Sequence, residues 1–130
     1  MAAYLSPAWF DDVNQVAGAA AELRAATSGA DVVLQQVITR PAGGDLRYWV
    51  RVTDGTVQVG PGEAQQPNAT VTQSYGTAVA LSRGERRVED AILAGDTRLA
   101  GDIDALVRHQ AALQTVATVL AEVHSRTTYD

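Results

Sequence analysis

Cysteine and lysine are both missing from this sequence of 130 residues. Without cysteine the chain can form neither disulfides nor thiolate nucleophiles, and it lacks the usual frameworks for structural zinc. Without lysine it cannot form a Walker-type phosphate loop, which requires a lysine after its glycines. The glycines of Gly43-Gly44 and Gly60-Pro61-Gly62 are therefore expected to serve turns rather than phosphate binding.

Positive charge is scarce, because ten arginines stand against fifteen acidic residues and the net charge is −5. Nucleic-acid binding requires basic patches that neutralise phosphates. The densest basic stretch, residues 83–87, contains a glutamate and is followed by two more acidic residues. We therefore expect no nucleic-acid partner and no tight docking on anionic membranes.

Long hydrophobic runs are missing as well. No stretch approaches the roughly 20 apolar residues of a membrane-spanning helix, so we expect no stable membrane insertion. Residues 1–10 lack the basic segment and the apolar run of a signal peptide, which favours a cytoplasmic location. The hydrophobic content of 46% and the length are typical of one globular domain, which we expect to span residues 1–130.

Groups that could support catalysis or hold a metal are few and scattered. The histidines, His109 and His124, lie on one predicted helix and would be roughly 22 Å apart, too far to share a metal. Paired carboxylates occur at Asp11-Asp12, Glu89-Asp90 and Asp102/Asp104. These pairs lie at predicted helix starts, where carboxylates stabilise the helix dipole. We therefore expect no catalytic residue, no metal and no cofactor.

The chain begins with a pattern that is typical of an amphipathic helix. Ser6 can cap this helix and Pro7 suits its first turn, and Ser28-Gly29 is expected to end it. An apolar stripe recurs at helical spacing between these points, at Trp9, Val13, Val16, Ala20 and Leu23.

A strand pattern follows the first helix. Residues 31–40 are rich in valine and isoleucine, and residues 45–53 alternate between an apolar face and a face that carries two arginines. Asp54-Gly55 is a strong hairpin signal before a third strand over 56–60. These three runs predict an antiparallel meander.

The remaining segments complete an α+β pattern. After a polar loop we expect a fourth strand over 69–73, short helices over 75–83 and 88–94, a fifth strand over 97–101, and a last helix from 102 to about 125. Asp102 is a suitable cap for that last helix. The sequence therefore predicts a five-stranded, mostly antiparallel sheet with helices covering one face and long helices at both ends of the chain.

Five phrases occur in a particular order along the chain. They are Tyr4 to Phe10, Arg47 to Val52 with Asp54 to Val59, Asn68 to Thr72, Leu81 to Glu85, and Gly101-Asp102 followed by Ile103 to Leu113. Their order and spacing resemble the sterol carrier protein 2 family, particularly its small stand-alone bacterial members. One position departs from the family pattern, which often has a basic residue where this chain has Asp96 after Gly95.

The resemblance implies an elongated apolar pocket between sheet and helices, which holds a fatty acyl chain, acyl-CoA, a sterol or a similar lipid. It implies no enzyme activity, no cofactor and no catalytic residue. On this basis we expect the pocket to be lined by Leu34, Tyr48, Val50, Val71, Val79, Ile92, Leu99, Leu106 and Leu113. Tyr48 can also offer its hydroxyl to a ligand head group. The alternative is that these side chains fill an ordinary, closely packed core.

Trp49 is the residue that supports a different function. Strand alternation puts it opposite Tyr48, on the outer face between Arg47 and Arg51. There it either packs under the arginine stems or anchors a protein interface, because tryptophan is a frequent interface anchor. An interaction or dimerisation module with a filled core, including a homodimer, is therefore the alternative function. A small enzyme with dispersed acid and base groups is the least favoured hypothesis, because no residue pattern points to it.

Overall fold

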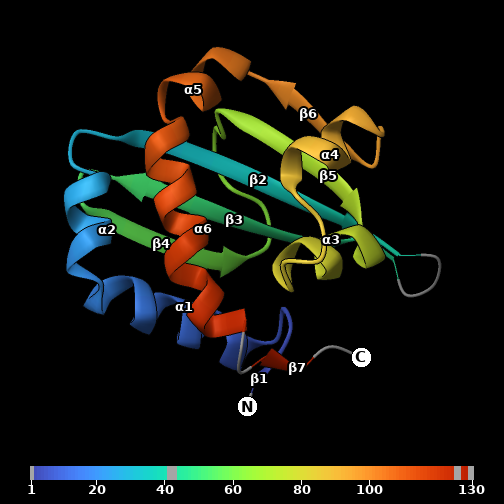
Figure 1. The fold of residues 1–130 in the computed structure, drawn as a ribbon, viewed down its shortest axis with the longest axis horizontal. Coiled ribbons are helices and arrows are strands. Elements are labelled where there is room, and N and C mark those ends of the chain that lie inside the picture. The colour runs from blue at the N-terminus through green and yellow to red at the C-terminus, as the bar shows by residue number, and fades with distance from the viewer. Residues whose placement is uncertain (1, 41–43, 125–126, 129–130) are drawn as a thin grey trace.

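A five-stranded mixed sheet organises the computed structural model, which describes residues 2–40, 44–124 and 127–128 (Figure 1). The strands are β2 (Asp31–Thr39), β3 (Leu46–Thr53), β4 (Thr56–Pro61), β5 (Ala69–Ser74) and β6 (Thr97–Gly101). They lie in the order β4-β3-β2-β5-β6. In this sheet β2 and β5 are parallel and the other neighbouring pairs are antiparallel, which confirms the predicted mostly antiparallel sheet.

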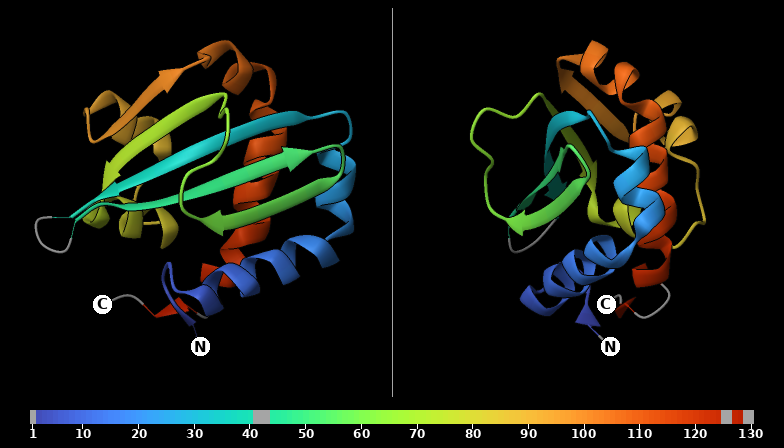
Figure 2. Two further views of the ribbon diagram at one scale, coloured as in Figure 1. Left: turned by 180° about the vertical axis from the view of Figure 1, so that it is seen from behind. Right: turned by 90° about the vertical axis from the view of Figure 1, so that its left-hand side faces the viewer.

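The hairpin between β3 and β4 turns at Asp54-Gly55, as the sequence predicts. These two residues have φ values of 39° and 87°, the left-handed conformation that a tight two-residue turn requires. The chain then leaves β4, crosses the face of the sheet that carries no helices, and returns beside β2 (Figure 2). Because of this crossover, β5 runs parallel to β2 instead of extending the meander.

The helices lie on one face of the sheet, the inner face, and along one edge (Figure 2). The elements are α1 (Pro7–Ala19), α2 (Ala21–Ala26), α3 (Tyr75–Ser82), α4 (Val88–Leu93), α5 (Ile103–Arg108) and α6 (Gln110–His124). Helix α6 crosses the inner face with α2 packed beside it, and α1 packs along β4 and against α6. Helices α3, α4 and α5 pack on β5 and β6. The prediction that helices cover one face is confirmed.

The main core lies between the inner face and α6. Val32 and Val52 pair across β2 and β3, and neither has exposed surface. Leu23 of α2 and Val116 of α6 belong to the same hydrophobic cluster and close it from the helical side. Burying one such aliphatic side chain contributes about 1.5–3 kcal/mol. This cluster therefore anchors α2 and α6 to the sheet.

Both terminal helices are interrupted, which corrects the prediction of two long continuous helices. The first ends at Ala20, whose extended backbone (φ −85°, ψ 104°) separates α1 from α2. Helix α1 packs along the edge strand β4 and against α6, and after the break α2 packs beside α6 in a new direction. The second break is at His109, whose Nε2 accepts a hydrogen bond from the backbone amide of Asp31 at 3.2 Å. The predicted end of the last helix, at residue 125, lies outside the described residues.

The two ends of the chain meet in a short ribbon that the sequence does not predict. Strands β1 (Ala2–Ala3) and β7 (Thr127–Thr128) pair in parallel near the start of α1 (Figure 1). Two-residue strands are too short to show a periodicity in the sequence. Thr127 is buried, and its hydroxyl donates to the carbonyl of Val123 at 2.7 Å, which ties the ribbon to α6.

Candidate functional site

A row of half-buried side chains crosses the inner face of the sheet. Tyr48, Gln36, Val71 and Leu99 are register neighbours on β3, β2, β5 and β6, so they stand side by side. All four lie on the face that the helices cover, yet each keeps part of its surface accessible. The helices therefore leave this strip of the inner face incompletely covered.

The neighbouring row on the same face is covered more completely. Leu34 and its register partner Ala69 are 8% and 2% exposed, and both belong to the main cluster. Three further apolar residues pack against this cluster but remain half-buried: Val50 of β3, Leu106 of α5 and Leu113 of α6. Apolar side chains thus form a continuous layer from the sheet to α5 and α6, and part of the surface of this apolar layer remains accessible.

The structure brings most of the predicted lining residues together. Leu34, Val50, Leu106 and Leu113 meet at the main cluster, as just described. Tyr48 packs with Val50 against a second hydrophobic cluster, which consists of Trp9, Phe10, Val13, Val59 and Val123. Val71 and Leu99 pair with each other in the half-buried row. Their shared role as pocket walls stays a prediction.

The two remaining predicted residues lie on the short helices. Val79 of α3 is half-buried, and Ile92 of α4 is 38% exposed. Helix α4 buries Ala91, whereas Val88 is 48% exposed. Helix α4 packs on β6 through this small alanine. A lining role for Ile92 and Val79 stays a prediction.

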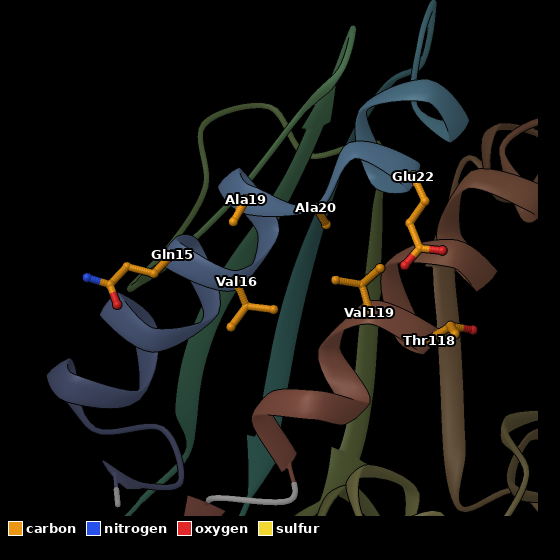
Figure 3. A pocket seen from close by; sticks show the side chains of 7 residues that line it. All are labelled: Gln15, Val16, Ala19, Ala20, Glu22, Thr118 and Val119. Atoms are coloured by element: carbon orange, nitrogen blue, oxygen red, sulfur yellow. The ribbon is translucent and has the colours of Figure 1, made fainter.

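A groove of about 470 Å³ opens between α1–α2 and α6 (Figure 3). It is lined by Gln15, Val16, Ala19, Ala20, Glu22, Thr118 and Val119. Val16 and Val119 project towards each other across the gap, whereas Gln15 projects away from it (Figure 3). Val119 belongs to the main cluster, and Val16 and Ala20 pack against it. The floor of the groove is therefore formed by apolar side chains that belong to the main cluster or pack against it.

None of the predicted lining residues belongs to this groove. Val16 and Ala20 belong to the apolar stripe predicted for the first helix, and both are half-buried in the structure. Ala17, one residue along, is the buried member of that turn. The signal that could have located the groove is the run of small residues over 17–21, whose short side chains leave space beside α6.

An aromatic cluster closes the end of the half-buried row nearest α1. Five of the seven Phe, Trp and Tyr residues of the chain belong to it: Tyr4, Trp9, Phe10, Tyr48 and Tyr75. The Trp9 ring lies edge-on to its neighbours, with centroids 5.2 Å from Tyr4, 5.2 Å from Phe10 and 6.1 Å from Tyr48. Such arrangements contribute about 0.5–1.5 kcal/mol per pair beyond the area that they bury. The cluster is therefore a rigid wall that joins α1 to the sheet.

Tyr48 keeps its proton over an unusually wide range of pH. Burial disfavours the phenolate and raises the pKa of Tyr48 to about 12, and a side-chain hydrogen bond with Tyr4 opposes this rise. The phenol is thus neutral at any physiological pH. Its hydroxyl group lies at the end of the row and has Tyr4 as a hydrogen-bond partner.

We expect the free energy of unfolding to fall as the pH rises from about 10 to about 12, because only the unfolded chain releases the Tyr48 proton there. The unfolded state then binds fewer protons than the folded state, which lowers stability with increasing pH. At about 1.4 kcal/mol per pKa unit, the loss is about 2–3 kcal/mol. Urea unfolding of the protein and of Tyr48→Phe at about pH 9 and about pH 12 measures it. An equal loss in Tyr48→Phe would contradict the assignment to this residue.

Charged groups are kept away from the inner face. Alternation and register place no aspartate, glutamate or arginine on the inner face of the five strands. Within the described part of the chain no charged residue is buried, and no group of three or more His, Asp or Glu could hold a metal ion. The ion pairs are on the surface, such as Arg86 with Asp96 at 2.9 Å. Asp96 therefore has a structural partner at the position where the resembled family often carries a basic residue.

Trp49 lies on the outer face, as predicted, and has contacts of its own there. Its ring covers the backbone of its register partner Gly60, where an added Cβ would collide with the indole. The Arg51 guanidinium lies 5.5 Å from the ring centroid. On the other side is Gln35, which is buried on this face and is held by residues of the loop after β4, including Ala64 at 2.6 Å. These contacts explain Trp49 within the fold, and its role at an interface stays a prediction.

None of the described helices is both long and apolar enough to cross a membrane. The side chain of His109 contacts the start of β2, and the side chain of His124 is not among those described. The described structure thus adds no chemical group to the site beyond the apolar layer, the groove and the aromatic cluster.

A family model described as the SCP-2 sterol transfer family matches residues 10–114 of the chain. This segment runs from the first turn of α1 into α6 and includes the whole sheet. No curated protein is a significant match to the sequence.

Solved structures share the fold at low sequence identity. A conserved hypothetical protein of Thermus thermophilus, described as possibly a sterol carrier protein, is 21% identical with a TM-score of 0.73, over 91% of this chain and 87% of that one. Sterol carrier protein 2 of Yarrowia lipolytica in its apo form is 16% identical with a TM-score of 0.67, over 85% and 87%. Palmitated SCP2L2 of Aedes aegypti is 22% identical with a TM-score of 0.63, over 85% and 90%.

Proposed function

Because this chain belongs to the SCP-2 sterol transfer family, we propose that it binds a hydrophobic ligand without catalysis, as a single cytoplasmic carrier domain. The ligand class is a fatty acid, acyl-CoA, a sterol or a similar lipid. The palmitated SCP2L2 of Aedes aegypti shares the fold and supports this class. The observation that carries the proposal is the half-buried row Tyr48, Gln36, Val71 and Leu99 beneath the helices.

The ligand chain would lie along this row, between the sheet and the helices. Its apolar walls would be the residues predicted from the sequence, and most of them surround the main cluster or the row. Apolar contact contributes about 25 cal/mol for each Å² removed from water. The absence of charged side chains from the inner face of the five strands favours an apolar occupant over a polar one.

The groove between α1–α2 and α6 would be the route by which the ligand reaches the row. Its floor residues Val16, Ala20 and Val119 contact the same cluster as the proposed walls. The break at Ala20 and the short length of α2 would allow this part of the helical layer to move while the sheet stays in place. Entry of the ligand through this groove would leave the outer face of the sheet unchanged, including Trp49 and the loop after β4.

Native mass spectrometry of the purified protein, combined with organic extraction, tests the proposal. We expect an additional bound mass in the lipid range, or uptake of a fluorescent fatty acid by protein that is isolated empty. A protein that carries no lipid and takes up no fatty acid, sterol or acyl-CoA would contradict the proposal. The core would then be filled, and the interface hypothesis for Trp49 would become the better one, with Trp49→Ala and light scattering as its test.

A further inference from the structure

Trp9 carries a hydrogen-bond donor that the described structure leaves without an acceptor. The residue is 3% exposed, and its indole Nε1 is buried with no partner among the described residues. Nearly all buried polar groups in proteins have a protein or water partner, and leaving one unpaired costs free energy. A contact of the N–H with a neighbouring aromatic ring is weak and does not replace a full acceptor. Nε1 of Trp9 can therefore donate a hydrogen bond to an acceptor that is not among the described residues.

Trp9 lies beside Tyr48, the residue at one end of the half-buried row. Trp9 is 6.1 Å from Tyr48 between ring centroids, and Tyr48 begins the half-buried row that continues with Gln36. The Tyr48 side chain already forms a hydrogen bond with Tyr4. Trp9, Tyr4 and Tyr48, each with one polar side-chain atom, thus belong to one cluster beside the end of the row.

The electrostatics of this end disfavour a charged group. The inner face of the five strands carries no arginine, and none of the described basic residues is buried. Tyr48 cannot supply a positive charge, and its high pKa reports that ionised groups are poorly solvated here. An ionised carboxylate or phosphate would lose its water without gaining a counter-charge, which is far more costly than burying a neutral oxygen with a hydrogen bond.

Resting on the proposed function, we propose that the aromatic cluster is the head-group site, where Nε1 of Trp9 donates a hydrogen bond to an uncharged oxygen of the ligand. The ligand class that it selects is an alcohol, ketone or ester, in preference to an ionised carboxylate or phosphate. The ligand's hydrocarbon part extends from this site along the row towards Leu99.

An indole ¹⁵N-labelled sample and two ligands that differ only at the head group test this inference. The chain has two tryptophans, so the spectrum has one indole signal from Trp9 and one from Trp49. The variant Trp49→Phe assigns them, and Trp49 on the outer face is the internal control. The ligands are decan-1-ol and decanoate at about pH 7.5, where the carboxylate is ionised.

We expect decan-1-ol to bind about tenfold or more tightly than decanoate and to move the Trp9 indole proton downfield while Trp49 stays unchanged. Trp9→Phe should weaken decan-1-ol binding by about three- to tenfold, the value of one hydrogen bond, and leave decanoate binding unchanged. The spectrum of the unaltered protein decides the matter if this variant does not fold. Equal or tighter binding of decanoate, or an unmoved Trp9 signal with decan-1-ol bound, would overturn this inference alone. Failure of both ligands and of longer-chain lipids to bind would overturn the proposed function as well.

Discussion

Leu106→Glu is expected to abolish lipid uptake by a protein that remains folded. Leu106 is half-buried on α5 and packs against the main cluster beneath the helices. A carboxylate that points into this layer would have to be buried unpaired whenever a ligand fills the space. Such a charge costs about 3–5 kcal/mol, so the apparent affinity should fall about 100-fold or more. Titration with a fluorescent fatty acid and a sterol measures the loss.

The matched control is Val107→Glu on the same helix. Val107 is 65% exposed, so its carboxylate would stay in water and uptake should be unchanged. In the empty protein the carboxylate of Leu106→Glu can still reach solvent from its half-buried position, and we expect unfolding to be easier by about 1–2 kcal/mol. Circular dichroism checks the fold of both variants. Normal uptake by folded Leu106→Glu would show that the ligand does not occupy the space beneath α5.

Ala20→Trp should slow the exchange of ligand about tenfold or more, with little change in the equilibrium affinity. Ala20 lies at the break between α1 and α2 and lines the groove against α6. An indole at this position would fill the groove and hinder both uptake and release. Stopped-flow mixing with a fluorescent fatty acid gives the association rate, and transfer to lipid vesicles gives the release rate.

Ala25→Trp is the matched control for the groove. Ala25 is exposed on α2, and it is not among the residues that line the groove. Its exchange rates should equal those of the unaltered protein. If Ala20→Trp exchanges ligand at the same rate, the ligand does not pass between α2 and α6. The opening would then have to be sought along the half-buried row, near Leu99 and β6.

The sheet could be predicted from the sequence because its signals are local. Alternation over β3 assigns Tyr48 and Val50 to one face and Trp49 to the other, and the register confirms this division. The turn at Asp54-Gly55 follows from the positive φ that these residue types tolerate. Helix caps could also be predicted from the sequence. Asp102 was expected to cap the last helix, and its side chain accepts a hydrogen bond from the amide of Ala105.

The helix breaks could not be predicted in this way, because they depend on which neighbours each half of a helix meets. Residues 17–21 have high helix propensity, and nothing local shows that the chain must change direction at Ala20, between α1 along β4 and α2 beside α6. The bend at His109 depends on a contact with Asp31, which is distant in the sequence. Tertiary packing overrides helix propensity at both places.

The candidate site was predictable in part for the same reason. The strand residues Val71 and Leu99 were expected to line the pocket, and they lie as register partners on the inner face. The aromatic cluster was missed, because it joins Tyr4 and Trp9 with Tyr48 and Tyr75, which come from three distant segments. The lone donor on Trp9 is a property of its surroundings and leaves no trace in the order of the residues.

The pairing of β1 with β7 bears on how this fold can be joined to other chains. Ala2 and Thr127 are register partners, so the polypeptide enters and leaves the fold at one point. This domain could therefore be inserted into a surface loop of another protein. The two ends of the opened loop would be joined to the two neighbouring ends of the domain, which is the geometry that favours domain insertion. The same closeness allows the ends to be linked and the chain reopened at another surface turn, to give a circular permutant. Polypeptide segments joined to the two ends of the domain would therefore leave it from the same place on its surface.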